Sequence, residues 1–369
     1  MQNYCPEKIF INISVKNHWL TKKILNFYSQ IPICTIDDSK EIEFNLNEKE
    51  DPINEGKKYL YITKNKGSFV KKCPGTNGFI CCNYYVIDLI ENCHLECSYC
   101  FLQNYLSEKV IKIYVNVENL FNELDTIFID PNKFYRIGTG ELSDSLALDE
   151  ATNFSSLLIN YFSSKKNVLL ELKTKTNSIN NLLNIKTKGE TVISWSLNPD
   201  KIIQTDENKS SSLNERIDKA YQCQKNGYQL AFHFDPIIYY ENWLADYKDL
   251  IDKLFAKVDS KRIAWISLGG FRYNPPLDKI IQKRFPTSQI IYQEFLESPD
   301  GKMRYFIKIR EEIYKNMLKI LLEKDPNLFI YLCMEGKYLW KRVFGFNPKN
   351  DNNLDKLFAK RQKLILKNI

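Results

Sequence analysis

Three cysteines, Cys93, Cys97 and Cys100, stand close together in the chain at a spacing that suits iron–sulfur chemistry. Three thiolates at this spacing can wrap one corner of an iron–sulfur cubane, and Cys thiolates are the usual ligands of such clusters. A ferredoxin-like electron carrier would need a fourth nearby cysteine, typically followed by proline, and none follows Cys100. The pattern therefore predicts a [4Fe–4S] cluster with one open iron, which is a catalytic feature.

Zinc is the main alternative for these thiols. Zinc sites favour paired Cys-x-x-Cys or Cys/His sets, and a fourth ligand is available in His94 or in the upstream Cys73, Cys81 and Cys82. An accidental grouping of cysteines is the remaining alternative. For His94 itself we expect a residue of the loop rather than a metal ligand.

The composition favours one large enzyme-sized domain with appendages, because 369 residues of which 44% are hydrophobic can bury a large core. No run of about 18 uncharged apolar residues occurs, and the first residues lack a basic segment followed by an apolar one. We therefore expect no membrane span, no signal peptide and a cytoplasmic location. In that reducing compartment ten cysteines favour metal or redox chemistry over disulfides. The net charge of +7 allows a nucleic-acid partner, although dispersed lysines are as typical of a solvated surface.

The elements that must position the cysteines alternate between short apolar runs and amphipathic stretches. Apolar runs predict strands at residues 84–90, 134–138, 168–173, 191–196, 228–234 and 262–268. Stretches of helical period lie at 117–124, 149–162, 213–226, 243–258 and 277–284. Repeated βα units imply a parallel sheet with helical crossovers. The expected fold is α/β, a partial (β/α)6 TIM-type barrel of parallel strands.

A partial barrel leaves a lateral opening for a large substrate. We divide the chain into a mixed α/β region at 1–75, the barrel at 76–300 and a C-terminal helical extension at 301–369. The extension is expected to hold an amphipathic helix at 303–323, a seventh apolar run at 328–333 that adds one strand, and a lysine-rich helix from about 354. The cysteine loop follows the first barrel strand, at the carboxyl end where active sites of such barrels lie.

The motif Cys-x3-Cys-x2-Cys, with Tyr99 just before its last cysteine, resembles the signature of the radical S-adenosylmethionine superfamily. The resemblance implies a [4Fe–4S] cluster and S-adenosylmethionine as cofactors. It further implies that the open iron chelates the methionine moiety and that one electron cleaves the sulfonium to give a 5′-deoxyadenosyl radical. Tyr99 would then lie near the adenine.

Further stretches, together spanning about residues 80 to 345, resemble the spore photoproduct lyase family and its relatives. The stretch 99–103 is similar to that family's Tyr-Cys-Tyr-Leu-Gln, with Phe101 in place of the second Tyr. The other matching stretches, in chain order, are 137–144, Ser196, 211–216, 235–237, Arg272 and 331–335.

The turn at 138–143 is the first predicted cofactor site beyond the cysteines. Its glycines, Gly138 and Gly140, permit close approach of the backbone, and the Glu141 carboxylate can accept the ammonium of the methionine moiety, with Ser143 beside it. An ordinary strand-to-helix turn is the alternative. For Asp144 we expect support of this loop or capping of a helix rather than acid–base chemistry.

By resemblance, Lys175 would hold the methionine carboxylate, with Lys173 as its close rival. Ser196 would bind the ribose or the carboxylate. Arg216 and Arg272 would contact a carboxylate or phosphate, and a structural salt bridge is an equal alternative for each. His233 lies in a strongly apolar strand, so we expect a satisfied core histidine.

One departure from the family concerns the hydrogen-atom donor. Spore photoproduct lyases carry a cysteine in the turn that here spans 138–143, and it returns a hydrogen atom to the repaired thymine radical. Glu141 or Leu142 takes its place in this chain, and neither donates hydrogen atoms readily. Cys333 is the candidate substitute if the seventh strand completes the pocket; a buried structural cysteine is the alternative.

The sequence therefore predicts a radical S-adenosylmethionine enzyme of the spore photoproduct lyase-like family. An external flavodoxin or ferredoxin would reduce the cluster, and hydrogen would be abstracted from a substrate such as a DNA pyrimidine lesion. The alternatives are modification of RNA, a peptide or a metabolite, and a non-catalytic iron–sulfur protein that binds nucleic acid or transfers electrons. No role is readable for the first 75 residues.

Overall fold

The computed structural model describes residues 4–73, 75, 78–128, 130, 132–186, 188, 190–348 and 351–367. Its largest sheet has eight strands in the order β17-β13-β12-β11-β10-β9-β6-β4, and all neighbours are parallel except β4 (Val70–Lys72), which runs antiparallel to β6 (Tyr85–Ile87). The parallel strands that follow β6 are β9 (Tyr135–Gly138), β10 (Val168–Thr174), β11 (Thr191–Ser196), β12 (Gln229–Ile237), β13 (Ile263–Gly270) and β17 (Ile330–Leu332). This curled sheet confirms the predicted partial barrel, including the added seventh strand.

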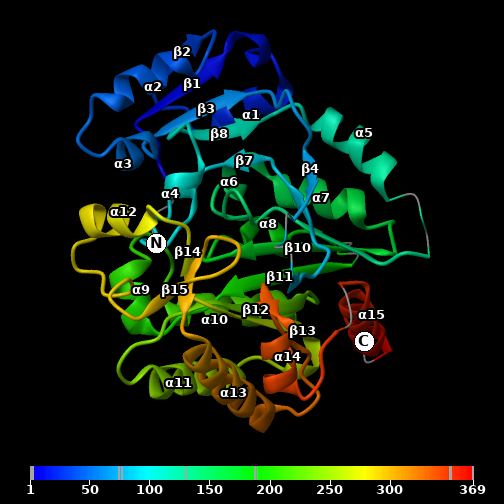
Figure 1. The fold of residues 1–369 in the computed structure, drawn as a ribbon. Helices are drawn as coiled ribbons and strands as arrows, with labels where there is room; N and C mark the ends of the chain where they lie inside the picture. Colours follow the sequence, from blue (N-terminus) through cyan, green and yellow to red (C-terminus); the bar gives the residue numbers. More distant parts are fainter. Residues whose placement is uncertain are drawn as a thin grey trace.

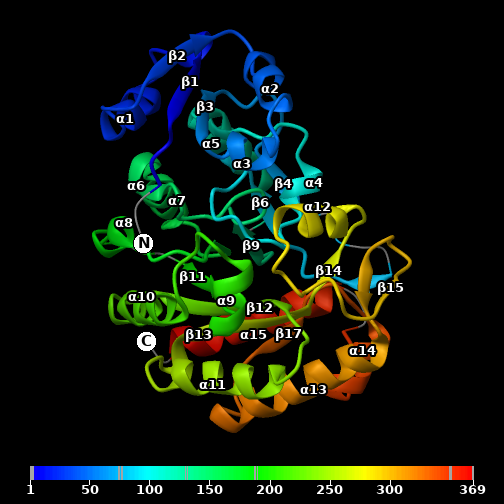
Figure 2. The same ribbon diagram turned by 90° about the vertical axis from the view of Figure 1, so that its left-hand side faces the viewer.

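The barrel strands form because their sequences are apolar on both faces, as a sheet covered on both sides requires. Every residue of β11 and of β13 is buried. The helices that cover the outer face are α7 (Phe154–Phe162), α10 (Leu213–Lys225), α11 (Trp243–Phe255) and α13 (Ile307–Lys324). Figure 1 shows these helices on the outside of the sheet, and Figure 2 shows the same arrangement from the side.

Two predicted helices differ in their bounds. The stretch 149–162 is divided into α6 (Asp149–Thr152) and α7 because Asn153 adopts a left-handed backbone conformation, with φ of 58°. The expected helix at 303–323 begins at Ile307, because Met303–Tyr305 forms strand β16. This strand pairs antiparallel with β15 (Phe295–Glu297) and β14 (Arg272–Tyr273).

A second sheet, of five strands in the order β2-β1-β3-β8-β7, stands above the barrel in Figure 1. Strands β1 (Lys8–Asn12), β2 (Ile33–Ile36) and β3 (Tyr59–Thr63) come from the N-terminal region. Strands β7 (Ile90–Glu91) and β8 (Ile111–Tyr114) flank the cysteine loop in the sequence. The cysteine loop is therefore held between the two sheets. The domain boundary predicted at residue 75 stays a prediction.

Helix α15 (Asp351–Lys367) closes the amino end of the barrel strands. Its Phe358 packs edge-on against Trp265 of β13, with ring centroids 5.6 Å apart, and against Tyr331 at 5.1 Å. The guanidinium of Arg136, from β9, lies 3.4 Å from the centre of the Phe358 ring. Because this end is filled by side chains, the opposite end, where the carboxyl ends of the strands meet the cysteine loop, is left to bind ligands.

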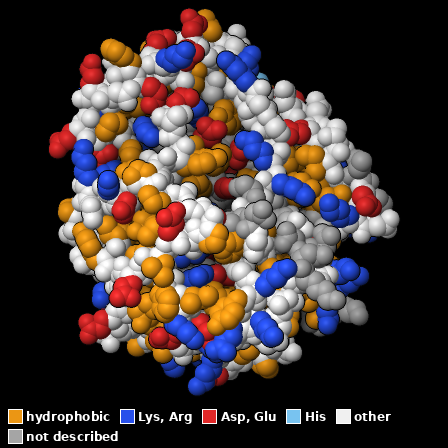
Figure 3. All heavy atoms as spheres, viewed as in Figure 1, with side chains coloured by type: hydrophobic (Ala, Val, Ile, Leu, Met, Phe, Trp, Pro, Cys, Tyr) orange, Lys and Arg blue, Asp and Glu red, His pale blue; other side chains and the backbone are white. Residues whose placement is uncertain are grey.

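On the face shown in Figure 3, Lys and Arg side chains are scattered among acidic and apolar ones rather than gathered in one basic patch. Among the described residues, no helix is both long enough and apolar enough to cross a lipid bilayer.

Candidate active site

The cysteine loop runs from β7 to the short helix α4 (Leu102–Tyr105). Asn92 has a left-handed backbone, with φ of 71°, and its side chain accepts the amide of Cys93 at 2.8 Å while donating to the carbonyl of Lys109 at 2.6 Å. Burial raises the pKa of Cys97 well above its usual range, and the negative charges of Cys100 and Cys93 raise it further. The three thiols therefore converge.

This convergence fits an iron–sulfur cluster. No group of three His, Cys, Asp or Glu side chains in the described part of the chain is close enough to hold a single metal ion. The thiolates of a cubane each bind a different iron, so they lie farther apart than ligands of one ion. Burial raises the pKa of Cys93 to about 12, so its thiolate needs a positively charged partner such as iron.

A network of buried charges fixes the loop to its neighbours. Glu96, between the first two cysteines, has a left-handed backbone and lies 2.5 Å from the ammonium of Lys57 and 2.7 Å from the guanidinium of Arg284. His94 stacks on Tyr4, with ring centroids 4.5 Å apart, and burial lowers its pKa to about 3. His94 is thus a neutral, packed residue of the loop.

Lys175 is the lysine that faces the cysteines. It follows β10, and its backbone amide donates to Asp144 at 2.7 Å. Its ammonium lies 5.7 Å from the centre of the Tyr99 ring. Burial works to lower the pKa of Lys175, but the charges of Cys97 and Glu207 outweigh burial and raise it. Asp144 also accepts the amides of Leu146 and Ala147, which is the loop support that was predicted.

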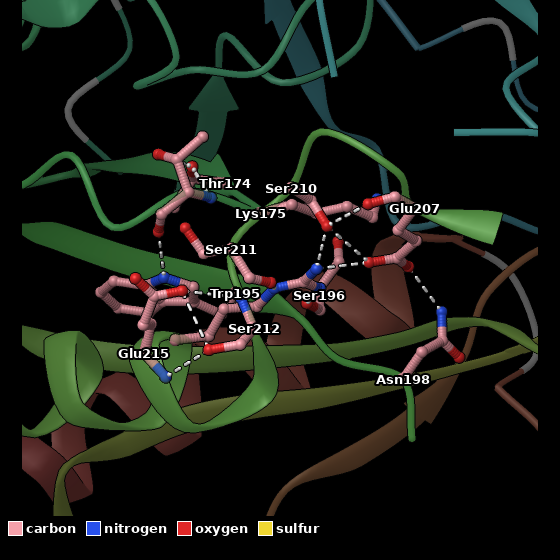
Figure 4. Close-up of polar contacts among 12 residues, drawn as sticks. Thr174, Lys175, Trp195, Ser196, Asn198, Glu207, Ser210, Ser211, Ser212 and Glu215 are labelled. Atoms are coloured by element: carbon pink, nitrogen blue, oxygen red, sulfur yellow. Dashed lines mark hydrogen bonds and ion pairs between the residues drawn. The ribbon is translucent and has the colours of Figure 1, made fainter. Parts of the chain in front are cut away.

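Glu207, just after α9 (Asp200–Asp206), lies at the centre of a set of residues that we call the Glu207 group: Tyr99, Lys175, Asn198, Glu207 and Arg216, of which all but the half-buried Lys175 are buried. Tyr99 donates its hydroxyl proton to Glu207, and Asn198 donates to the same oxygen at 2.9 Å. Figure 4 shows Asn198 and Ser210 reaching Glu207 from two sides. Burial raises the pKa of Glu207, but Arg216 and Lys175 hold it at about 2.

The guanidinium of Arg216 donates its hydrogen bonds to groups inside the protein. It lies 2.5 Å from Glu207, and it donates to the carbonyls of Ser196 and Ser211, each at 2.9 Å. The salt-bridge alternative therefore describes Arg216. Ser196, at the end of β11, contacts the Glu207 group through its carbonyl, which accepts the hydrogen bond from Arg216. A role of Ser196 in cofactor binding stays a prediction.

Sequence reasoning did not find Glu207, because it belongs to no motif. The only signal was its place just before the matching stretch 211–216.

The two glycines of the predicted cofactor turn are explained by neighbours within the chain. A Cβ atom on Gly138 would collide with the hydroxyl of Tyr84 and lie 2.5 Å from the carbonyl oxygen of Glu171, and one on Gly140 would lie 3.0 Å from the Lys173 side chain. Ser143 is buried. Contact of this turn with a cofactor stays a prediction.

Glu141 belongs to a second set of side chains, which we call the Asp235 group: Glu141, Lys173, Asp235, Arg272 and Cys333. Burial and the charge of Asp88 raise the pKa of Glu141, while Lys173 opposes this. Arg272 lies 3.0 Å from Asp235 and donates to the sulfur of Cys333 at 3.7 Å. The two lysines therefore have different neighbours: Lys173 lies in the Asp235 group, and Lys175 lies in the Glu207 group.

A buried pair of polar side chains joins β10 and β12. His233 lies 2.6 Å from Glu171, and both side chains are buried. Burial raises the pKa of Glu171, but His233 holds it at about 2. His233 is therefore the satisfied core histidine that was predicted.

Comparison with known proteins places this geometry in context. The family model described as spore photoproduct lyase matches residues 4–323. The spore photoproduct lyase of Bacillus subtilis is 30% identical over 225 residues, which cover 60% of this chain and 64% of that protein. The enzyme of Clostridium acetobutylicum is 25% identical over 239 residues, covering 64% and 69%. The chain thus aligns with less than two thirds of the Bacillus relative.

Among solved structures, a spore photoproduct lyase complexed with dinucleoside spore photoproduct superposes with a TM-score of 0.80 at 21% identity, covering 90% of this chain and 100% of that one. A variant with bound AdoMet and the same ligand superposes equally well. At this identity the likeness shows the fold. The family match confirms the resemblance predicted from the motifs, to radical S-adenosylmethionine enzymes whose cofactors are a [4Fe–4S] cluster and S-adenosylmethionine.

Proposed function

Because this chain belongs to the spore photoproduct lyase family, we propose that it cleaves S-adenosylmethionine reductively and reverses a thymine-derived DNA lesion of the spore photoproduct type. The observation that carries the proposal is the position of Lys175, whose ammonium lies 5.7 Å from the centre of the Tyr99 ring and near enough to Cys97 to feel its charge. No ion pair is found for this ammonium among the described residues, so it is available to a carboxylate.

The residues of the Glu207 group bind and orient the cofactors. Cys93, Cys97 and Cys100 hold the cluster, and Lys175 holds the methionine carboxylate. When bound, the cluster and S-adenosylmethionine together supply the carbon radical that abstracts hydrogen from the substrate. Tyr99 contributes its ring beside the adenine.

The turn after β9 and the end of β11 complete the cofactor site. The proposed contacts come from Gly138, Gly140, Glu141, Ser143 and Ser196. The charged neighbours of Glu141 are Asp88, Lys173, Lys71 and Lys302, of which Lys173 belongs to the Asp235 group.

The Asp235 group faces the substrate. Its guanidinium and ammonium groups, from Arg272 and Lys173, suit an anionic nucleic-acid strand. Cys333 acts as hydrogen-atom donor: its S–H bond breaks, a C–H bond forms on the product radical, and a sulfur-centred radical is left on Cys333. The family's usual donor position holds Glu141 here, so a thiol from elsewhere in the barrel has to serve.

The electron that starts each reaction comes from an external flavodoxin or ferredoxin. Such a partner and the nucleic acid must reach the protein from solution, and a cytoplasmic location would supply both. Each of these partners is part of the proposal.

The proposal is tested on anaerobically reconstituted protein with dithionite, S-adenosylmethionine and dinucleoside spore photoproduct. We expect release of 5′-deoxyadenosine and conversion of the lesion, and Cys97→Ala should abolish both. A protein with an intact cluster that releases no 5′-deoxyadenosine would contradict the enzyme assignment. Release of 5′-deoxyadenosine with an unchanged lesion would instead point to RNA, a peptide or a metabolite as the substrate.

A further inference from the structure

The N-terminal region, for which the sequence suggested no role, places two charged residues close to the cysteine loop. Both flank the short helix α3 (Pro52–Gly56), since Asp51 precedes it and Lys57 follows it. Helix α3 packs closely on the chain just beyond the loop, because a Cβ atom on Gly56 would collide with the backbone carbonyl of Lys109. Charges from a distant part of the sequence can therefore reach the cluster cysteines.

Glu96 is the loop residue that these charges meet. It stands between Cys93 and Cys97 in the sequence, is buried, and has a left-handed backbone with φ of 53°. This conformation is unfavourable for a residue with a side chain, so it persists only where contacts enforce it. The carboxylate of Glu96 lies 2.5 Å from the ammonium of Lys57 and 2.7 Å from the guanidinium of Arg284. We call Lys57, Glu96 and Arg284 the Glu96 triad.

Arg284, the last residue of α12 (Leu277–Arg284), holds the loop from another direction. In Figure 1, α3 stands above α4 and α12 stands below it. The guanidinium of Arg284 lies 2.8 Å from the carboxylate of Asp51 and donates to the side chain of Gln103. Gln103 in turn donates to the carbonyl of Ser98 at 2.7 Å. The triad is therefore connected to the chain on both sides of the second cluster cysteine.

The charges of the triad are buried, so water screens them little. The side chains of Lys57, Glu96 and Arg284 are each at most 7% exposed. Inside a protein, charges a few ångströms apart interact more strongly than they do in water. Burial raises the pKa of Cys93 and the charge of Lys57 opposes this, which agrees with an ammonium near that thiol. A cluster held by the cysteines must therefore respond to the charges of the triad.

We propose that the Glu96 triad sets the reduction potential of the cluster, with the cations of Lys57 and Arg284 favouring entry of the electron and the carboxylate of Glu96 opposing it. The net charge around an iron–sulfur cluster is one of the factors that fix its potential. The inference rests on the proposed function, because the cysteines must hold the cluster. It gives the N-terminal region a role, which is to supply Lys57.

The step that the triad assists is a transfer of one electron. The external flavodoxin or ferredoxin is oxidised by one electron, and the cluster site gains one negative charge without a bond or a proton being exchanged. The triad has two cations and one carboxylate, which leaves a net charge of +1 to stabilise the reduced state. Asp51 adds a further carboxylate beside Arg284, but its side chain is 36% exposed and water screens it more.

The proposal is tested by the midpoint potential of the reconstituted protein, measured in an anaerobic redox titration followed by electron paramagnetic resonance. Lys57→Met should lower the potential and Glu96→Gln should raise it. Each change should alter the ratio of reduced to oxidised cluster about tenfold at a fixed potential, which is about 59 mV for one electron. The double variant Lys57→Met/Glu96→Gln should return close to wild type. Unchanged potentials, or shifts of the same sign in both single variants as a loosened loop would produce, would overturn the proposal.

Three further variants separate charge from structure. Lys57→Arg keeps the charge and should keep the wild-type potential. Glu96→Gly suits the left-handed turn but lacks the carboxylate, so it should raise the potential as Glu96→Gln does. Lys58→Met is the matched control, because Lys58 pairs with Glu55 at 2.8 Å outside the triad, and it should leave the potential unchanged. A wild-type potential in Glu96→Gly, or a shift in Lys58→Met equal to that in Lys57→Met, would overturn the assignment to the triad.

Circular dichroism and iron content verify the fold and the cluster of each variant. If Lys57→Met does not fold, the opposite behaviour of Lys57→Arg and the two Glu96 variants decides the proposal. A wild-type protein that binds no cluster would contradict the proposed function and this inference with it. A wild-type cluster that cleaves S-adenosylmethionine, together with unshifted potentials in the variants, would contradict the role of the triad alone.

Discussion

The two groups of charged side chains at the carboxyl ends of the barrel strands differ in how fully their charges are neutralised. In the Glu207 group, a single carboxylate collects a tyrosine, an asparagine and a fully buried arginine, and that arginine donates to two carbonyls as well. In the Asp235 group, Arg272 is partly exposed and uses two of its contacts on the sulfurs of Cys333 and Met334. The contacts of the Glu207 group hold its side chains in one arrangement. The Asp235 group keeps polar groups available for a ligand.

The largest expected effect separates the two lysines. Lys175→Met removes the cation beside Cys97 and Tyr99, so kcat/KM for S-adenosylmethionine should fall roughly 10²–10³-fold, as loss of one partner of a buried charge pair does. Lys173→Met is the matched control, because it lies in the Asp235 group. It should leave S-adenosylmethionine binding intact and lower conversion of the lesion. Isothermal titration measures the affinity of each variant for S-adenosylmethionine, and a lesion assay measures its conversion of the lesion. Equal losses of cofactor affinity in the two variants would contradict the different roles of the two lysines.

The two arginines should differ in stability. Arg216→Met leaves the carboxylate of Glu207 buried without its main partner, so the free energy of unfolding should fall by about 3–5 kcal/mol. Arg272→Met removes a partner from a less enclosed pair, whose side chains are 17% and 19% exposed, so a smaller loss than for Arg216→Met is expected. Urea unfolding of the anaerobic proteins compares them. A larger loss for Arg272→Met would reverse our view of which group is the structural one.

Two barrel carboxyls should respond to pH in opposite directions. The pKa of Glu171 is held at about 2, below its unfolded value, so its stabilisation is complete above about pH 4.5 and is lost as the pH falls towards 2. Glu141 has a raised pKa, so its ionisation destabilises the fold as the pH rises.

Unfolding free energies measured from pH 2 to pH 7 test this contrast. Glu171→Gln should flatten the loss of stability below pH 4.5, by at most about 3 kcal/mol. Glu141→Gln should be neutral in acid and slightly stabilising near pH 7. Parallel curves for both variants and wild type would refute the contrast.

The last expected effect concerns why Gly138 is a glycine. Gly138→Ala should cost about 1–3 kcal/mol, because its methyl group meets the Tyr84 hydroxyl. The double variant Gly138→Ala/Tyr84→Phe should recover part of this loss, whereas a glycine needed for cofactor contact alone would show no such coupling. Thermal unfolding of the two single variants and the double variant closes the cycle.

Much of the fold was readable from the sequence because the barrel strands are continuous apolar runs, as at Thr191–Ser196 and Ile263–Gly270. The helix expected to start at residue 303 was wrong at its beginning, because the pairing of Met303–Tyr305 with β14 and β15 is decided by segments distant in the chain. Helical periodicity reports only on neighbours in the sequence.

The sequence by itself predicted the three cysteines as cluster ligands and indicated the family, because both follow from local motifs. Only the tertiary structure placed Lys175 rather than Lys173 near Cys97, and only it brought Glu207 next to Tyr99, Asn198 and Arg216. Lys173 lies in β10 and Lys175 follows it two residues later, and strand alternation alone would put both side chains on the same side, so no sequence pattern distinguishes them. The two lysines differ in how far along the chain they stand relative to residues of the neighbouring strands and loops. Those neighbours are brought to their positions only when the whole barrel has folded.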